Sequence, residues 1–74
     1  TEPHARITGN VFAELRAALK PRGCTVYSEV LRVRVEAADL FTYPDLSVVC
    51  GEARFFDARR TSLVNPTVLV EVLS

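Results

Sequence analysis

The feature that most constrains this chain is an almost unbroken apolar run near its end, Thr67-Val-Leu-Val-Glu-Val-Leu73. Its valines favour a strand, and its lack of polar alternation is typical of a strand buried on both faces in the middle of a sheet. Such a strand needs neighbours on both sides and a layer on each face. We therefore expect a central strand over residues 67–73, and a natural domain that continues past Ser74 with at least one more helix.

The first segment has helical periodicity, which predicts one amphipathic helix over about residues 4–20. Pro21 cannot donate a backbone hydrogen bond and Gly23 tolerates unusual dihedral angles, so the helix should end there. The apolar stripe consists of Ile7, Val11, Leu15, Ala18 and Leu19.

Two further strands are predicted between this helix and the apolar run. Residues 24–35 are rich in β-branched side chains and alternate from Val30 onward, with a bulge or break near Ser28. A short strand follows at about residues 46–50. The fold class is therefore α/β, more narrowly α+β. It has an N-terminal helix followed by a mixed β-sheet, in one domain over residues 1–74 that is truncated after its third main strand.

Composition excludes several classes of protein. Nine basic and nine acidic residues give a formal net charge of zero, so there is no global attraction to nucleic acid. We find no apolar stretch long enough to span a membrane and no signal peptide, which makes the cytoplasm the expected location. Cys24 and Cys50 lie in apolar runs without metal-type spacing, so we expect both to be buried free thiols.

Glu71 is the charged residue that interrupts the apolar run. Within a strand its side chain would share a face with Leu69 and Leu73, where an ionised carboxylate is costly unless it is paired or bound to a metal. Taken alone, Glu71 is more often a strand-end residue that reaches solvent, or the partner of an arginine such as Arg32 or Arg34.

Asp45 is the second carboxylate of interest. It opens the strand predicted at residues 46–50 and follows Pro44, which restricts the direction of the chain. Taken alone, Pro-Asp is a common turn dipeptide. If the strands at 46–50 and 67–73 are neighbours, however, Asp45 and Glu71 converge on one point. Mg²⁺ takes one or two carboxylates together with waters and phosphate oxygens, and it activates water for attack on phosphorus.

Two segments resemble a known family: Tyr43-Pro-Asp-Leu-Ser-Val-Val49 and Asn65-Pro-Thr-Val-Leu-Val-Glu-Val-Leu-Ser74. They are similar to a bacterial restriction-endonuclease-like family, long known as a domain of unknown function, within the PD-(D/E)XK nuclease superfamily. An N-terminal histidine followed by an amphipathic helix, as in His4 to Leu19, fits the same pattern. The resemblance covers essentially the whole chain and implies a restriction-endonuclease-like core.

The resemblance also implies roles for particular residues. Asp45 and Glu71 would be the catalytic carboxylates that bind Mg²⁺ or Mn²⁺, and the backbone carbonyl of Val72 would complete the protein ligands. The lysine position of the motif falls on Leu73, which departs from the pattern because leucine cannot hold water or stabilise charge. In this family the polar role is expected to come from a helix beyond Ser74.

Other candidate site residues have weaker signals. The superfamily sometimes adds an acidic residue from the first helix, and Glu14 lies at the rim of the apolar stripe; a solvated helix charge is the plainer interpretation. His4 is a second accessory candidate, or a partly buried histidine at the helix end. Glu29 is interpreted as a cross-strand charge partner. Three arginines between the acidic strands are either DNA-backbone contacts or solvated loop charges: Arg54, Arg59 and Arg60.

Three functions compete at this point. The first is a Mg²⁺-dependent endonuclease that hydrolyses DNA phosphodiester bonds. The second is a catalytically inactive nuclease-fold module that binds nucleic acid or a protein partner, which Leu73 and the zero net charge favour. The third is a structural fragment in which an arginine neutralises Glu71. We expect DNA as the partner, no membrane association, and an exposed sheet edge that can pair with another copy.

Overall fold

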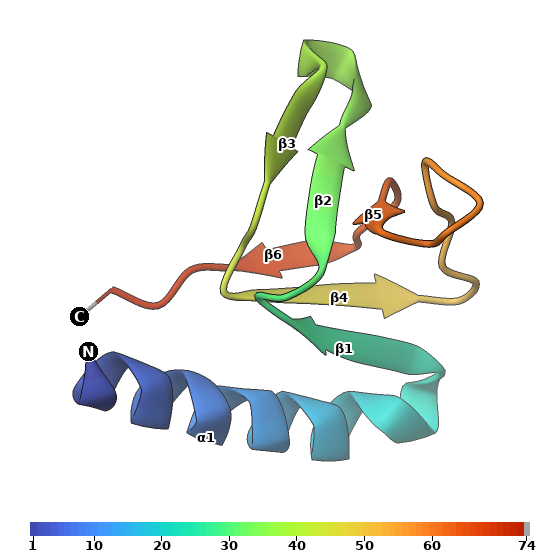
Figure 1. Cartoon of the computed structure of the whole chain (residues 1–74). Coiled ribbons are helices and arrows are strands. Elements are labelled where there is room, and N and C mark those ends of the chain that lie inside the picture. Colours follow the sequence, from blue (N-terminus) through green and yellow to red (C-terminus); the bar gives the residue numbers. More distant parts are fainter. Residues whose placement is uncertain (74) are drawn as a thin grey trace.

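The computed structural model describes residues 1–73, and Figure 1 shows one helix beside two small sheets. This is the predicted α+β arrangement of an N-terminal helix followed by mixed β structure. Two 3-10 turns, at Lys20–Arg22 and Glu36–Ala38, join the main elements. In chain order those elements are α1 (Glu2–Leu19), β1 (Cys24–Ser28), β2 (Arg32–Val35), β3 (Leu40–Thr42), β4 (Leu46–Cys50), β5 (Ser62–Leu63) and β6 (Val68–Val70).

Helix α1 begins and ends at residues with clear local signals. The Thr1 hydroxyl accepts a hydrogen bond from the His4 backbone N–H at 3.3 Å, and Glu2 places a negative charge in the first turn. After the 3-10 turn that contains Pro21, Gly23 adopts a left-handed conformation with φ 77°. Within the described chain, no helix is both long and apolar enough to cross a membrane.

The six strands form two three-stranded sheets. The first sheet has the order β1-β4-β6 and is antiparallel throughout. The second has the order β3-β2-β5, with β2 antiparallel to β3 and parallel to β5. The break predicted near Ser28 is the place where the chain leaves the first sheet and enters the second. In Figure 1 the β2–β3 hairpin stands away from the first sheet, and α1 runs alongside β1.

The core lies between the two sheets. Val33 of β2, Val49 of β4 and Leu63 of β5 are fully buried against one another. Four half-buried side chains surround this cluster: Tyr27, Leu31, Ala53 and Phe55. Because side chains alternate along a strand, Leu46 and Val48 point to the opposite face of β4 from Val49, and they too are buried. Strand β4 is therefore enclosed on both faces.

The strand expected at residues 67–73 is shorter in the structure, and its central place, which requires neighbours beyond Ser74, stays a prediction. The apolar run contributes only β6, which lies at the edge of the sheet in the described chain, with Val68 49% and Leu69 43% exposed. The strand ends early because continuing its register with β4 would pair Val72 with Pro44, which has no backbone N–H. Glu71 consequently lies just beyond the strand rather than within it.

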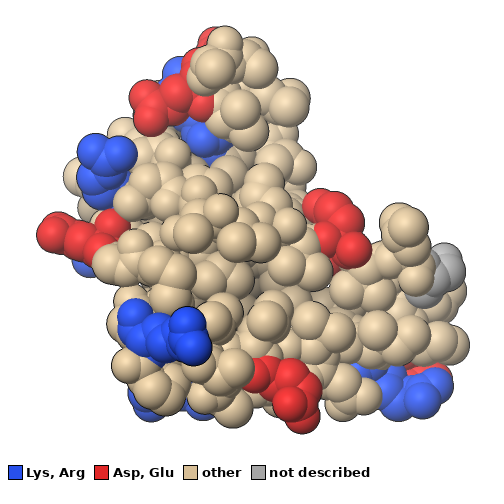
Figure 2. Space-filling model, turned by 180° about the vertical axis from the view of Figure 1, so that it is seen from behind, with Lys and Arg blue, Asp and Glu red and all other residues tan. Residues whose placement is uncertain are grey.

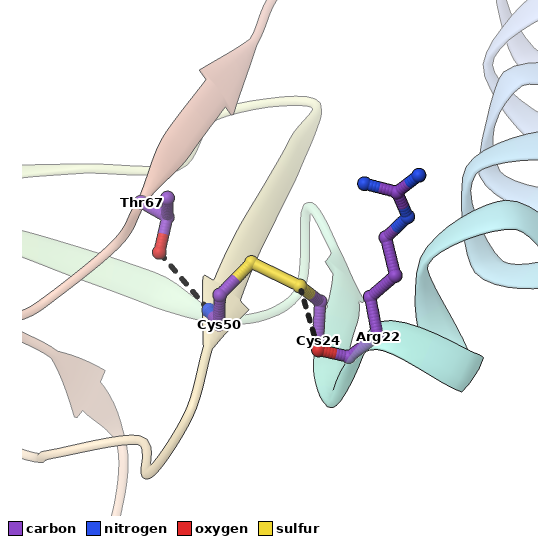
Figure 3. The surroundings of a disulfide bond; sticks show 4 residues. All are labelled: Arg22, Cys24, Cys50 and Thr67. Carbon is purple, nitrogen blue, oxygen red and sulfur yellow. Dashed lines mark hydrogen bonds between the residues drawn. A yellow bond between two sulfur atoms is a disulfide. The ribbon is translucent and has the colours of Figure 1, made fainter.

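The cysteines correct a second expectation. Cys24 and Cys50 are opposite each other on β1 and β4, with their Cα atoms 4.0 Å apart, and they form a disulfide rather than free thiols. Figure 3 shows the Thr67 hydroxyl accepting a hydrogen bond from the Cys50 N–H at 3.0 Å, next to the disulfide. Sequence spacing could not reveal this pair, because it depends on which strands are neighbours and in which register.

We predict that removing the disulfide destabilises the fold. The bridge closes a loop over a sequence separation of 26, and a loop of this size is worth about 3 kcal/mol in chain entropy of the unfolded state. The variant Cys24→Ser/Cys50→Ser should lose about this much free energy of unfolding in a urea titration. A thiol reductant should lower the wild type to the level of the variant and leave the variant unchanged. A wild type that is indifferent to reductant would contradict the pairing.

Candidate functional site

Asp45 lies at the point where three distant parts of the chain meet. It comes directly before β4, after the buried Pro44. Its Oδ2 accepts a hydrogen bond from the backbone N–H of Val72 at 2.7 Å, and its Oδ1 lies 3.1 Å from Nε2 of His4 in the first turn of α1. Figure 1 shows the segment after β6 running toward the start of α1, as these contacts require. The Asp45 side chain is 19% exposed.

These contacts hold the pKa of the Asp45 carboxyl below its ordinary value of 3.8. The Val72 N–H is the largest cause, and partial burial opposes it. The hydrogen bond and charge of His4, and then a side-chain hydrogen bond with Glu71, lower the pKa further. Asp45 is therefore ionised at neutral pH and can only accept hydrogen bonds, so Nε2 of His4 must carry the proton that joins them.

Glu71 reaches the same place from the segment after β6. It directly precedes Val72, whose N–H bonds Asp45, and its side chain is exposed; it makes the smallest of the contributions that lower the pKa of Asp45. The arginines proposed as its partners are engaged elsewhere. Arg34 pairs with Asp39 at 2.9 Å, and Arg32 donates from Nε to the Ser62 hydroxyl at 2.7 Å. The strands next to the two residues, β4 and β6, are neighbours, as the predicted convergence of the two side chains requires.

The donor set of this site suits a hard cation that keeps part of its water shell. In residues 1–73, no group of three or more His, Cys, Asp or Glu side chains is placed to hold a metal ion. Mg²⁺ does not need such a group, because it commonly takes only one or two carboxylates with waters and phosphate oxygens. Asp45 and Glu71 fit this requirement. The N–H of Val72 is committed to Asp45, and its carbonyl as a ligand stays a prediction.

The remaining candidates are not brought to this point. Glu14 is exposed and lies ten residues after His4 on α1, which is about 15 Å along the helix axis. Its accessory role gains no support from this placement. Helix α1 instead meets Asp45 through its first turn.

The three loop arginines lie beyond the far end of β4 from Asp45. A five-residue strand separates them from the carboxylate by about 16 Å. All three arginines are exposed, and the Arg60 guanidinium stacks 4.6 Å from the centre of the Phe55 ring. On the face shown in Figure 2, basic and acidic side chains are interspersed rather than gathered into a basic patch.

A pocket beside Asp45 contains two residues that the sequence did not single out for this site. It has a volume of about 210 Å³ and is lined by His4, Ala5, Thr8, Glu29 and Asp45. Glu29 lies in the turn after β1, so its interpretation as a cross-strand partner is wrong. The buried Thr8 hydroxyl has no hydrogen-bond partner within the described residues. Its position four residues after His4, on the same helix face, was the available signal.

The chain is similar to known proteins over nearly its whole length. A family model, Uma2, described as "Putative restriction endonuclease", matches residues 1–74. An uncharacterised protein of Synechocystis sp. is 28% identical over 71 residues, which cover 96% of this chain and 40% of that protein. The chain thus spans about 40% of the length of the curated relative that it matches. No solved structure matches it.

We predict that Asp45 makes folding stability fall in acid. Because its pKa is lower in the folded than in the unfolded state, its contribution is fully present above its ordinary pKa of 3.8 and is lost as the pH falls through the folded value. An NMR titration of the Asp45 carboxyl carbon should therefore give a midpoint below 3.8. The unfolding free energy of the wild type should fall in the same range.

The variant Asp45→Asn should lose this part of the pH dependence. Asp57→Asn is the matched control. Hydrogen bonds from Thr61 lower the pKa of Asp57 independently of Asp45, so this variant should keep the part of the pH dependence that comes from Asp45. An Asp45 midpoint at or above 3.8 would show that His4 and the Val72 N–H do not hold the carboxylate in solution.

Proposed function

This chain belongs to the Uma2 family, and from that membership we propose that it carries the metal-binding carboxylates of an endonuclease. The proposed enzyme uses Mg²⁺ or Mn²⁺ to hydrolyse phosphodiester bonds of DNA. Membership of this family supports a nuclease-like function. The metal, the DNA substrate and the catalytic residues are what we propose in addition.

The observation that carries the proposal is the meeting of the Asp45 and Glu71 carboxyl groups. Two ionised carboxylates brought close together repel each other, and a divalent cation between them relieves that repulsion. The Glu71 side chain is exposed, and no ion pair joins it to an arginine of the described chain, so it is accessible to a cation from solvent.

The residues of this chain would prepare the site in two ways. The Val72 N–H and the His4 imidazole hold the Asp45 carboxylate in place and keep it ionised, so a cation need not displace a proton from it at neutral pH. Glu71 supplies the second carboxylate, and the Val72 carbonyl a third oxygen. When bound, Mg²⁺ activates water and neutralises charge at the phosphorus.

Leu73 bears on whether the protein is catalytic. Its side chain is 92% exposed and occupies the lysine position of the motif. A leucine there can neither orient water nor stabilise developing charge, so we propose that a polar residue outside residues 1–74 supplies this function. The alternative is a catalytically inactive module that binds nucleic acid or a protein partner, which Leu73 and the zero net charge favour.

Partners and location are extensions of the same proposal. DNA is the proposed substrate, bound through a local surface, because the net charge of zero creates no global field. Arg54, Arg59 and Arg60 would contact its backbone at a distance from the carboxylates. A cytoplasmic location stays a prediction, and the Cys24–Cys50 disulfide weighs against it because the cytosol keeps most thiols reduced. We also propose self-association through β6, whose outer edge is unpaired within residues 1–73.

The test is cleavage of plasmid DNA by the full-length protein with Mg²⁺ or Mn²⁺. We predict that Asp45→Ala and Glu71→Gln each lower the rate by about 100-fold or more, because the loss of a metal ligand removes several kcal/mol of transition-state stabilisation. Glu52→Gln is the matched control, since Glu52 is an exposed carboxylate beyond the other end of β4. It should cleave as the wild type does.

The outcomes separate the candidate functions. Equal cleavage by the wild type and Asp45→Ala rules out the proposed site. A wild type that binds Mn²⁺ through Asp45 but leaves DNA intact supports the inactive module. A wild type that neither binds the metal nor cleaves DNA removes the basis of the nuclease proposal.

A further inference from the structure

We infer that His4 is a positioning residue of the metal site, acting through Asp45 without touching the cation. Its imidazole fixes one oxygen of the Asp45 carboxylate, so that the carboxylate keeps a single orientation toward Glu71. The inference rests on the proposed function, because it assumes that the cation is held by Asp45.

The Asp45 carboxylate is held at two points. Val72 donates to Oδ2 at 2.7 Å and His4 to Oδ1 at 3.1 Å. A carboxylate with one donor can rotate about that contact, whereas donors on both oxygens oppose rotation because it would break one hydrogen bond. The donors come from opposite ends of the chain, 27 and 41 positions away from Asp45. The orientation of Asp45 therefore depends on the docking of α1.

His4 is itself held in place by the start of the helix. Its backbone N–H donates to the Thr1 hydroxyl at 3.3 Å, and the Ala5 N–H donates to the Thr1 carbonyl at 3.0 Å. Pro3 restricts the backbone just before it. Thr8, one turn later, is buried. A donor on a capped and docked helix turn positions its acceptor more precisely than a donor on a loop does.

The nitrogen of His4 that faces Asp45 has no direct role in binding the cation. Nε2 of His4 lies 3.1 Å from Oδ1 of Asp45, so this nitrogen is already engaged by the carboxylate and does not face a cation. Each carboxylate oxygen accepts about two contacts, so the bonds to His4 and Val72 leave room on Asp45 for a cation. Outer-shell donors of this kind typically change metal affinity by about 10–100-fold.

The experiment compares two substitutions of His4 in the full-length protein, with Mn²⁺ as the probe in isothermal titration calorimetry. His4→Phe keeps a planar ring and removes the donor, and it should weaken Mn²⁺ binding by about 10-fold or more. His4→Gln places an amide N–H₂ near the position of Nε2, and it should bind within about 3-fold of the wild type, because the donor is restored. Thermal unfolding without metal reports the stability of each variant separately.

Two outcomes overturn the inference: wild-type affinity in His4→Phe, or equally weak binding in His4→Gln and His4→Phe. Asp45→Asn is the control for the proposed function. If it binds Mn²⁺ as tightly as the wild type, Asp45 is not a ligand, and the proposed site fails together with this inference. If Asp45→Asn loses binding while His4→Phe keeps it, the proposed site stands and only the role of His4 is wrong.

The positioning role of His4 can also be tested on the wild type, by measuring whether Nε2 keeps its proton when metal is added. In a ¹⁵N NMR spectrum at neutral pH, Nε2 of His4 should carry a proton both without metal and with saturating Mg²⁺. An Nε2 that loses its proton when Mg²⁺ is added would make His4 a ligand or a base, and would overturn the positioning role.

Discussion

The hydrogen bond from the Val72 N–H to the Asp45 carboxylate is the contact on which the arrangement of this site depends. It forms where the β4–β6 ladder ends, since Pro44 would face Val72 there and has no N–H for the Val72 carbonyl. Beyond the end of the ladder, the Val72 N–H bonds the Asp45 side chain. This contact brings the segment of Glu71 onto Asp45, lowers the pKa of Asp45, and leaves its other oxygen for His4.

Strand β4 gives the site a rigid support. It is buried on both faces, it has paired neighbours on both sides, and its two ends are constrained in different ways. At one end Asp45 joins α1 to the segment after β6. At the other end the disulfide joins Cys50 to Cys24 of β1, and the Thr67 hydroxyl bonds the Cys50 N–H. A small chain that buries little surface needs such cross-links to keep its carboxylates in register.

Several elements were predictable because their signals are local. The helix periodicity, its end near Pro21 and Gly23, the break near Ser28 and the strand at 46–50 all agree with the structure. The predicted convergence of Asp45 and Glu71 rests on one assumption, that their strands are neighbours, and the β4–β6 pairing meets that assumption. The length of the strand within the apolar run and the state of the cysteines differed from expectation, because the first depends on the facing Pro44 and the second on strand order and register.

The sequence by itself determined which residues can form a helix or a strand, and where the helix ends. These properties follow from spacing, side-chain shape and the fixed φ of proline, which act over a few residues. Only the tertiary structure decided that β4 is central, that Cys24 faces Cys50, and that His4 reaches Asp45. These facts depend on register and on packing between segments 26 to 41 positions apart, which no local pattern encodes.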